Sequence, residues 1–273
     1  MILVTGANGN LGSATLAALH ARDVVATGGS RKPGEGMRRL DFDDPAGLDL
    51  AGVSTLVLIS AGYAEDDQVV GRHAAVLEAA VRDGVHHVVY TSLTSAGDHL
   101  GFALAHRATE RLVRTSGLPW TILRNGLYAE LFGGLLIWAD SGVESPFGDG
   151  ALAAVPREDL ADAAAIVAAN PTRHSGRVYD LVGTPITAGQ VADRLGVPYG
   201  AISLVEYRRR LLDETPGLLP FQPPMLASIA TGIRHGFLDG TTTDLPDLLD
   251  RPVRDPLATA VAAASATRTE ANV

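Results

Sequence analysis

The sequence predicts an α/β protein whose doubly wound parallel sheet is followed by a smaller lobe. A short apolar strand at residues 2–4 passes through a glycine turn into a helix rich in alanine and leucine at residues 13–20. Short apolar strands then alternate with helices as far as Arg124, which is typical of parallel strands joined by crossover helices. Beyond Gly126 the alternation gives way to an apolar, aromatic stretch and to segments rich in proline, glycine and serine.

The composition narrows the classes of function. The formal net charge of −9 works against non-specific binding of nucleic acid. No apolar run is long enough to span a bilayer, the N-terminus lacks a signal-like pattern, and there is no cysteine for disulfide or thiolate chemistry. We therefore expect a cytoplasmic protein with neither nucleic-acid nor membrane partners, and the sequence leaves its oligomeric state open.

The glycine turn has the geometry of a pyrophosphate site. Gly6, Gly9 and Gly12 recur at three-residue intervals between the first strand and the first helix. Glycines let the backbone turn tightly and approach a phosphate, whose charge is held by free N–H groups at the positive end of the helix. An ordinary strand–helix turn is the alternative, but the clean strand-to-helix context favours a dinucleotide site.

A second strand, expected at residues 24–27, leads toward the adenosine ribose of such a site. Sites that prefer NAD place an acid there, whereas sites for NADP place cations. Here Arg31 and Lys32 follow the strand, and no acid occurs before Glu35. Both cations can pair with a 2′-phosphate, so we expect NADPH to bind and NADH to bind more weakly. The alternative is two solvated charges on a Gly/Pro loop.

The third and fourth strands, at residues 37–41 and 56–60, extend the expected cofactor site. Asp41 can accept a hydrogen bond from the adenine amino group while Phe42 lies against the ring. The fourth strand ends in small residues that would let the nicotinamide half approach: Ser60, Ala61 and Gly62.

A helix at residues 65–83 leads to the fifth strand at 85–90, from whose carboxyl end the hydroxyl residues of segment 91–95 emerge. Ligands of open α/β sheets bind at this edge. A helix at 103–116 and a strand at 120–124 complete the Rossmann-type half.

The second half reads as a smaller lobe that covers the substrate. We expect a Rossmann domain at 1–126 and a substrate-capping lobe at 127–273, partly interleaved with it. Further elements are expected at 157–169 (helix), 178–182 (strand), 187–195 (helix) and 207–240 (helix broken by four prolines). The tail after residue 263 is small and polar enough to fray.

Several stretches occur together in the order of a known family: VTGANGNLG (4–12), DFDD (41–44), VYTSL (89–93), HRATE (106–110), LRNGLY (123–128) and, more weakly, REDLA (157–161). With them the chain resembles atypical short-chain dehydrogenases/reductases of the NmrA-like group, especially their NADPH-dependent quinone oxidoreductase branch. The resemblance covers most of residues 1–200.

The resemblance implies a cofactor site made of three groups of residues. Gly6, Asn8, Asn10 and Leu11 would line the pyrophosphate beside the other glycines of the turn. Ser60, Ala61, Thr91 and Ser92 would line the ribose and nicotinamide, with Asn125 and Gly126 on the far side of the nicotinamide. Some members of the group are regulators that sense the nicotinamide pool, so a non-catalytic NADP-sensing protein is the alternative to an enzyme.

The usual proton relay of short-chain reductases, Tyr-x-x-x-Lys, is absent because Lys32 is the only lysine in the chain. His106 stands where the tyrosine would be, with Glu110 one helical turn on. His106 can donate a proton if Glu110 favours the imidazolium; otherwise it is a surface histidine. Ser95 or Ser92 can bind a substrate carbonyl, or merely cap the backbone.

These features favour an NADPH-dependent reductase that transfers a hydride to a carbonyl of a quinone or of a bulky aromatic or polycyclic ketone. The reduced quinone has stabilised phenolate oxygens that can take protons from water, whereas a ketone needs a proton donor. Tyr128 and Phe221, with the apolar stretch 131–138, suit an apolar aromatic substrate, although such stretches also build cores. No metal signature occurs.

Overall fold

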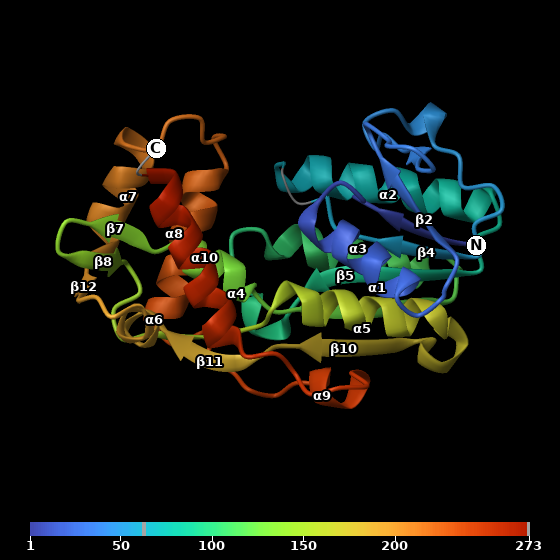
Figure 1. Cartoon of the computed structure of the whole chain (residues 1–273). Helices are drawn as coiled ribbons and strands as arrows, with labels where there is room; N and C mark the ends of the chain where they lie inside the picture. The colour runs from blue at the N-terminus through green and yellow to red at the C-terminus, as the bar shows by residue number, and fades with distance from the viewer. Residues whose placement is uncertain (62–63, 272–273) are drawn as a thin grey trace.

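Seven parallel strands form the central sheet of the protein (Figure 1). The structure is a computed structural model that describes residues 1–61 and 64–271. The strand order is β10-β6-β5-β4-β1-β2-β3, so the chain begins inside the sheet and winds outward to both edges, which confirms the doubly wound parallel fold. The bounds are β1 Ile2–Thr5, β2 Ala26–Ser30, β3 Arg38–Arg39, β4 Thr55–Leu58, β5 His87–Leu93, β6 Trp120–Asn125 and β10 Arg177–Leu181.

Two helical layers cover the sheet. Helix α1 (Asn10–His20) packs against α5 (Arg157–Ala169) on one face, and α2 (Asp66–Arg82) packs against α3 (Ala103–Thr115) on the other. Side chains alternate along each strand, so neighbouring residues of β1 enter different cores. Because both faces are covered, most of the strands read as continuous apolar runs.

The remaining elements build a lobe at the carboxyl edge of the sheet, on the left in Figure 1. It contains two small sheets, β11-β9 and β12-β8-β7. Its elements are α4 Ala129–Gly134, β7 Ile137–Ala139, β8 Gly142–Ser145, β9 Ala151–Ala154, β11 Thr184–Thr187, α6 Ala188–Leu195, β12 Tyr199–Ala201, α7 Leu204–Asp213, α8 Gln222–Arg234 and α10 Pro256–Ala271. The short helix α9, Leu245–Leu248, packs instead against α5 and β10. Within the described ranges no helix is long and apolar enough to cross a membrane.

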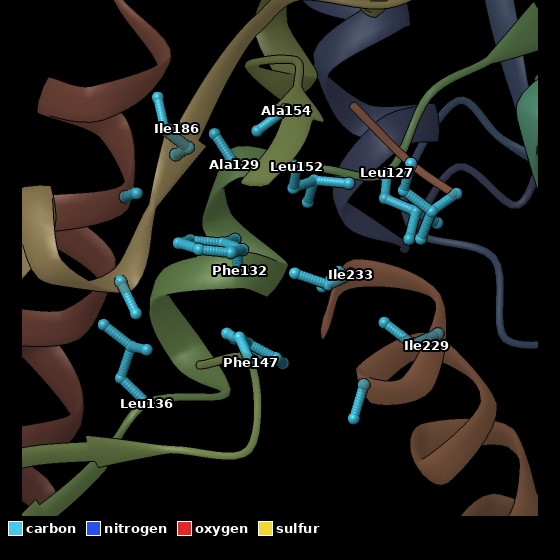
Figure 2. Packing of buried hydrophobic residues seen from close by; sticks show 14 of the residues in the cluster. Leu127, Ala129, Phe132, Leu136, Phe147, Leu152, Ala154, Ile186, Ile229 and Ile233 are labelled. Atoms are coloured by element: carbon cyan, nitrogen blue, oxygen red, sulfur yellow. The ribbon is translucent and has the colours of Figure 1, made fainter. Parts of the chain in front are cut away.

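The lobe has its own apolar core (Figure 2). The rings of Phe132 and Phe147 are stacked with their centroids 5.1 Å apart. Helix α10 packs against α4 at close range: a Cβ on Gly133 would lie 2.1 Å from the carbonyl oxygen of Ala260, so this position requires glycine. The lobe is therefore a packed unit rather than a set of loops.

Several expected elements differ in detail. Strand β2 lies at residues 26–30 rather than 24–27, and β3 is shortened to residues 38–39. Strand β5 continues to Leu93, so Thr91 and Ser92 lie within the strand rather than after it. Pro223 and Pro224 begin α8 instead of breaking it, because a proline in the first turn loses no intrahelical hydrogen bond.

The expected fraying after residue 263 is wrong as far as Ala271. Helix α10 continues through this segment, and its small side chains Ala260 and Ala264 are fully buried. The indole Nε1 of Trp138 donates to the carbonyl of Ala264 at 2.8 Å. The many alanines of this segment favour a helix, and packing against the lobe stabilises it.

Elements from beyond residue 126 complete the first half. Strand β10 pairs in parallel with β6. Helix α5 packs against α1 (Figure 1). The division at residue 126 stays a prediction, because these elements link the two parts.

His73 and His87 are buried between the sheet and its helices, and this predicts an acid-sensitive fold. Burial lowers the pKa of His73 to about 3 and that of His87 to about 4, so the folded protein keeps both neutral where the unfolded chain would protonate them. The free energy of unfolding should therefore fall as the pH drops from about 6.5 toward 4, by up to about 1.4 kcal/mol per pH unit for each group. Urea unfolding at several pH values would measure this slope.

The matched variants are His87→Asn and His86→Asn. His87 is buried with its Nε2 2.9 Å from Thr121 Oγ1, whereas His86 is exposed. The first variant should flatten the pH dependence and the second should keep the native slope. Identical slopes in the two variants would contradict the assignment to His87.

Candidate active site

A cleft of about 900 Å³ lies where the carboxyl ends of the parallel strands meet the lobe. This is the edge at which open α/β sheets bind ligands. The glycine turn and the ends of β2, β4, β5 and β6 form its floor. Helices α3, α4 and α8 supply a largely apolar wall: Phe102, Ala105, Leu131, Leu135, Met225, Leu226 and Ile229.

The glycine turn fits a pyrophosphate. Gly6 has a φ of +60°, and a Cβ on Gly12 would lie only 2.3 Å from the Gly6 carbonyl oxygen. Gly9 caps α1 without a side-chain hydrogen bond, so no side chain caps the amides of the first turn. The six residues expected at the pyrophosphate all line the cleft: Gly6, Asn8, Gly9, Asn10, Leu11 and Gly12.

The ribose end differs from the sequence prediction at two residues. Arg31 and Phe42 line the cleft, but Lys32 does not; its carbonyl accepts a hydrogen bond from Asn8 Nδ2 at 2.7 Å. Asp41 also lies outside the lining, where its carboxylate accepts from the amide of Asp43 at 3.2 Å. The turn after β3 therefore places Asp43, the second acid of the DFDD motif, in the cleft lining, and not Asp41.

Asp43 and Arg72 are residues of the ribose end that sequence reasoning missed. Arg72 donates to both carboxylate oxygens of Asp43, at 2.6 and 2.8 Å, and this pairing lowers the pKa of Asp43. Arg31 adds to that effect, so three charged groups stand close together here. No signal in the sequence marks Arg72, because it is one of several polar residues in the amphipathic pattern of α2.

The expected nicotinamide side comes together as one surface. Ser60, Ala61, Thr91, Ser92, Asn125 and Gly126 all line the cleft, whereas Gly62 lies outside the described residues. Ser60 Oγ and Asn125 Oδ1 are buried and have no hydrogen-bond partner within the described part of the chain. An unpartnered buried polar atom costs about 1–3 kcal/mol, so a polar ligand such as a nicotinamide nucleotide would relieve both.

His106 lines the cleft from α3, but not as an imidazolium held by Glu110. Its Nδ1 lies 3.1 Å from the hydroxyl of Tyr90. Burial, with a smaller contribution from Arg107, lowers the pKa of His106 to about 4, and Glu110 opposes this without reversing it. Glu110 therefore favours the charged form, as expected, but too weakly to offset burial, and His106 is neutral at neutral pH.

Glu110 has other partners. It is buried and accepts hydrogen bonds from Ser92 at 2.7 Å, from Arg107 at 2.7 Å and from Arg124 at 2.7 and 2.9 Å. Burial would raise its pKa, but the hydrogen bonds from Arg124 and Ser92 hold the pKa below its usual value. Two arginines on different elements thus fix this carboxylate below the cleft as part of the scaffold.

Two predicted residues lie elsewhere. The Ser95 hydroxyl accepts from Arg124 at 2.8 Å and its amide donates to Asp180 at 2.9 Å, so Ser95 supports the loop after β5 and does not line the cleft. Phe221 lines a smaller pocket of about 200 Å³ that shares Phe102 and Met225 with the cleft. Neither is in place to contact a substrate in the main cleft.

Tyr128 does line the cleft, beside a cation that sequence reasoning missed. The guanidinium of Arg157 lies 4.9 Å from the centre of the Tyr128 ring, and both residues are part of the lining. Arg157 is the first residue of α5 and of the REDLA stretch. That stretch is the sequence signal from which Arg157 could have been identified. Within the described ranges, no group of three or more histidine and acidic side chains could hold a metal ion.

Comparisons with known proteins agree with this cleft. Residues 6–171 match the model of a family described as NAD(P)H-binding. The chain is 33% identical to quinone oxidoreductase 2 of Escherichia coli K12, over 92% of this chain and 94% of that protein. The structure of Citrobacter sp. triphenylmethane reductase complexed with NADP(H) matches with a TM-score of 0.85 at 30% identity, over 96% of this chain and 99% of that one.

The NADP complex of the negative transcriptional regulator NmrA matches with a TM-score of 0.74. It covers 100% of this chain and 98% of its own, at 14% identity, and so shares the fold alone. The chain belongs to the NAD(P)H-binding family and, within it, to the NmrA-like atypical short-chain dehydrogenases/reductases.

Proposed function

We propose that this NADPH-dependent oxidoreductase reduces a quinone, with a bulky aromatic ketone as the second candidate acceptor. The observation that carries the proposal is the continuity of one cleft, which joins the glycine turn to an apolar wall supplied by α3, α4 and α8. A flat, apolar ring system would bury its faces against such a wall and leave its carbonyl at the polar floor. The relatives named quinone oxidoreductase and triphenylmethane reductase support an aromatic acceptor.

The acid–base groups of the cleft favour a quinone over a ketone. Bound NADPH would supply the hydride, and a quinone that takes it up becomes a phenolate, which needs only a proton from water. A ketone would become a far more basic alkoxide and would need a strong acid. Among the described residues of the cleft, His106 is neutral and Glu110 is fully paired, and the chain lacks the usual lysine.

The chain's own residues would then act by binding and orientation. The amides of the glycine turn would hold the pyrophosphate, and Ser60 and Asn125 would supply the unpartnered polar atoms beside the nicotinamide. The apolar wall would exclude water and align the acceptor ring, which is the contribution expected when proton transfer is not limiting.

A panel of quinones and bulky aromatic ketones tests the proposal, with the loss of NADPH absorbance as the readout. We expect turnover with quinones and little with ketones of similar size. Binding of NADPH without turnover across the panel would favour the non-catalytic NADP sensor instead. Preferential turnover of ketones would show that a proton donor operates in the cleft.

The preference for NADPH should depend on Arg31. A charge-assisted hydrogen bond to a 2′-phosphate contributes about 1.5–3 kcal/mol, so Arg31→Ala should reduce the ratio of NADH to NADPH dissociation constants by about 10- to 150-fold. The neighbouring Lys32→Ala is the matched control, because Lys32 lies outside the lining and should leave the ratio unchanged. Equal effects of the two variants would argue against the assignment to Arg31.

A further inference from the structure

We infer that the Tyr90 hydroxyl holds His106 in its Nε2–H tautomer, and that this neutral N–H donates a hydrogen bond to the acceptor oxygen of the substrate. His106 is then the catalytic residue and Tyr90 a positioning residue beneath it. The inference rests on the proposed reduction of a carbonyl acceptor. It gives His106 a role different from that of a cationic acid.

Tyr90 lies in the floor of the site with a hydroxyl that must donate. Its side chain is completely buried on β5, and burial raises the pKa of the phenol, so the hydroxyl keeps its hydrogen. A buried O–H requires an acceptor. His106 Nδ1 lies 3.1 Å from this hydroxyl, and the hydroxyls of Thr109 and Ser60 are its other polar neighbours.

The neighbouring histidine has a defined tautomer. The amide of Ala61 donates to His73 Nε2 at 2.9 Å, so the hydrogen of neutral His73 must be on Nδ1. This Nδ1–H faces Thr109 Oγ1 at 2.8 Å, and the Thr109 hydroxyl donates onward to the Ala105 carbonyl at 2.8 Å. Thr109 Oγ1 thus already accepts one hydrogen bond, which favours His106 Nδ1 as the acceptor of the phenol hydrogen.

A neutral imidazole that accepts at Nδ1 carries its hydrogen on Nε2. No hydrogen bond to Nε2 of His106 occurs within the described part of the chain, and the residue lines the cleft. The ring packs between Phe102 and Tyr90, with centroid distances of 6.2 and 6.3 Å. One N–H is thus held in a fixed orientation at the wall of the cleft.

The surroundings keep this imidazole neutral across the working pH range. The charged and titratable groups that face it are Arg107 and Glu110 on its own helix, Tyr90 on β5 and His73 on α2. With a pKa of about 4, His106 remains neutral from pH 6 to 8. A preorganised neutral donor stabilises negative charge as it develops on an oxygen without giving up its proton. The reduced acceptor then takes its proton from water, so the atoms balance.

The tautomer is tested directly by nitrogen-15 NMR of histidine-labelled protein with bound NADP⁺. We expect the His106 signals of an Nε2–H tautomer, assigned by their absence in His106→Gln, and a mixture of tautomers in Tyr90→Phe. An Nδ1–H tautomer in the unmodified protein, or the same tautomer in Tyr90→Phe, would overturn the positioning role. This readout does not depend on turnover.

Kinetics with a quinone acceptor test the donation. His106→Phe should lower kcat by about 100-fold, the effect of losing one oxyanion donor, with the dissociation constant of NADPH unchanged. His106→Gln places an amide N–H near the position of Nε2–H and should retain more of the rate. Equal losses in the two variants would refute the donor role.

The pH profile distinguishes the neutral donor from a cationic acid. The unmodified rate should be flat from pH 6 to 8, and a fall near the ordinary imidazole pKa of about 6.5 would overturn the inference. If no acceptor is reduced by the unmodified protein, the proposed function fails and the donation to substrate fails with it. The NMR result would still decide the Tyr90–His106 contact.

Discussion

Replacing Gly12 with alanine should weaken NADPH binding by about ten- to a hundredfold. The new Cβ would lie 2.3 Å from the carbonyl oxygen of Gly6 and 2.7 Å from its carbonyl carbon, both of which are backbone atoms. The turn would have to open, and overpacking of this kind costs about 1–3 kcal/mol, with about 1.4 kcal/mol for each tenfold change in affinity. Calorimetric titration with NADPH would measure the loss.

The matched control is Gly71→Ala. Gly71 lies within α2, and a Cβ at this position would meet no other atom within 4 Å. The same chemical change should therefore leave NADPH affinity unchanged and slightly stabilise the helix. Unchanged affinity in Gly12→Ala, with the fold intact, would mean that the turn does not hold the pyrophosphate.

Asp159→Ala should destabilise the protein by about 3–5 kcal/mol, because it removes one partner of a buried ionic network. The fully buried carboxylate of Asp159 accepts from Arg251 at 2.5 Å and from the side chain and amide of Arg254 at 2.6 and 2.9 Å. Asp162, on the next turn of α5, also pairs with both arginines. The network ties the segment leading into α10 to the first half of the chain, and urea unfolding would measure its contribution.

Glu158→Ala is the control on the adjacent residue. Its carboxylate pairs with Arg254 at 2.8 Å but is exposed, and exposed ion pairs contribute roughly 0–1 kcal/mol. We expect a small change in the unfolding midpoint for Glu158→Ala beside a large one for Asp159→Ala. Comparable changes in both would show that burial of the network is not what stabilises the docking of this segment.

The parts of the fold that could be predicted from the sequence are those with local signals. The apolar strands, the glycine turn and the helix Arg157–Ala169 each have a periodicity or boundary that depends on few distant contacts. The cleft lining at the strand ends followed from one topological rule, that parallel strands present their carboxyl ends at one edge. That rule brought residues as distant as Ser60 and Asn125 to the same surface.

The errors arose where the partner comes from another element. The spacing of His106 and Glu110 fits a helical pair, yet Arg124 on β6 and Arg107 bind the carboxylate instead. The sequence suggests that the Ser95 hydroxyl is available to a substrate, but in the fold it accepts a hydrogen bond from Arg124, and the Ser95 amide donates to Asp180. Single-sequence patterns do not reveal which distant side chain will compete for a polar group.

The late position of β10 and α5 in the chain has a consequence for synthesis. Strands β1 to β6 are complete once Asn125 has been made, but β6 has no neighbour on its outer side until Leu181 has followed. The face covered by α1 also lacks α5 until Ala169 has been added. Unpaired edges and bare apolar faces are where nascent chains associate wrongly. A ribosome that stalls between these points would present a half-covered sheet, so steady elongation through this segment protects the nascent chain from aggregation.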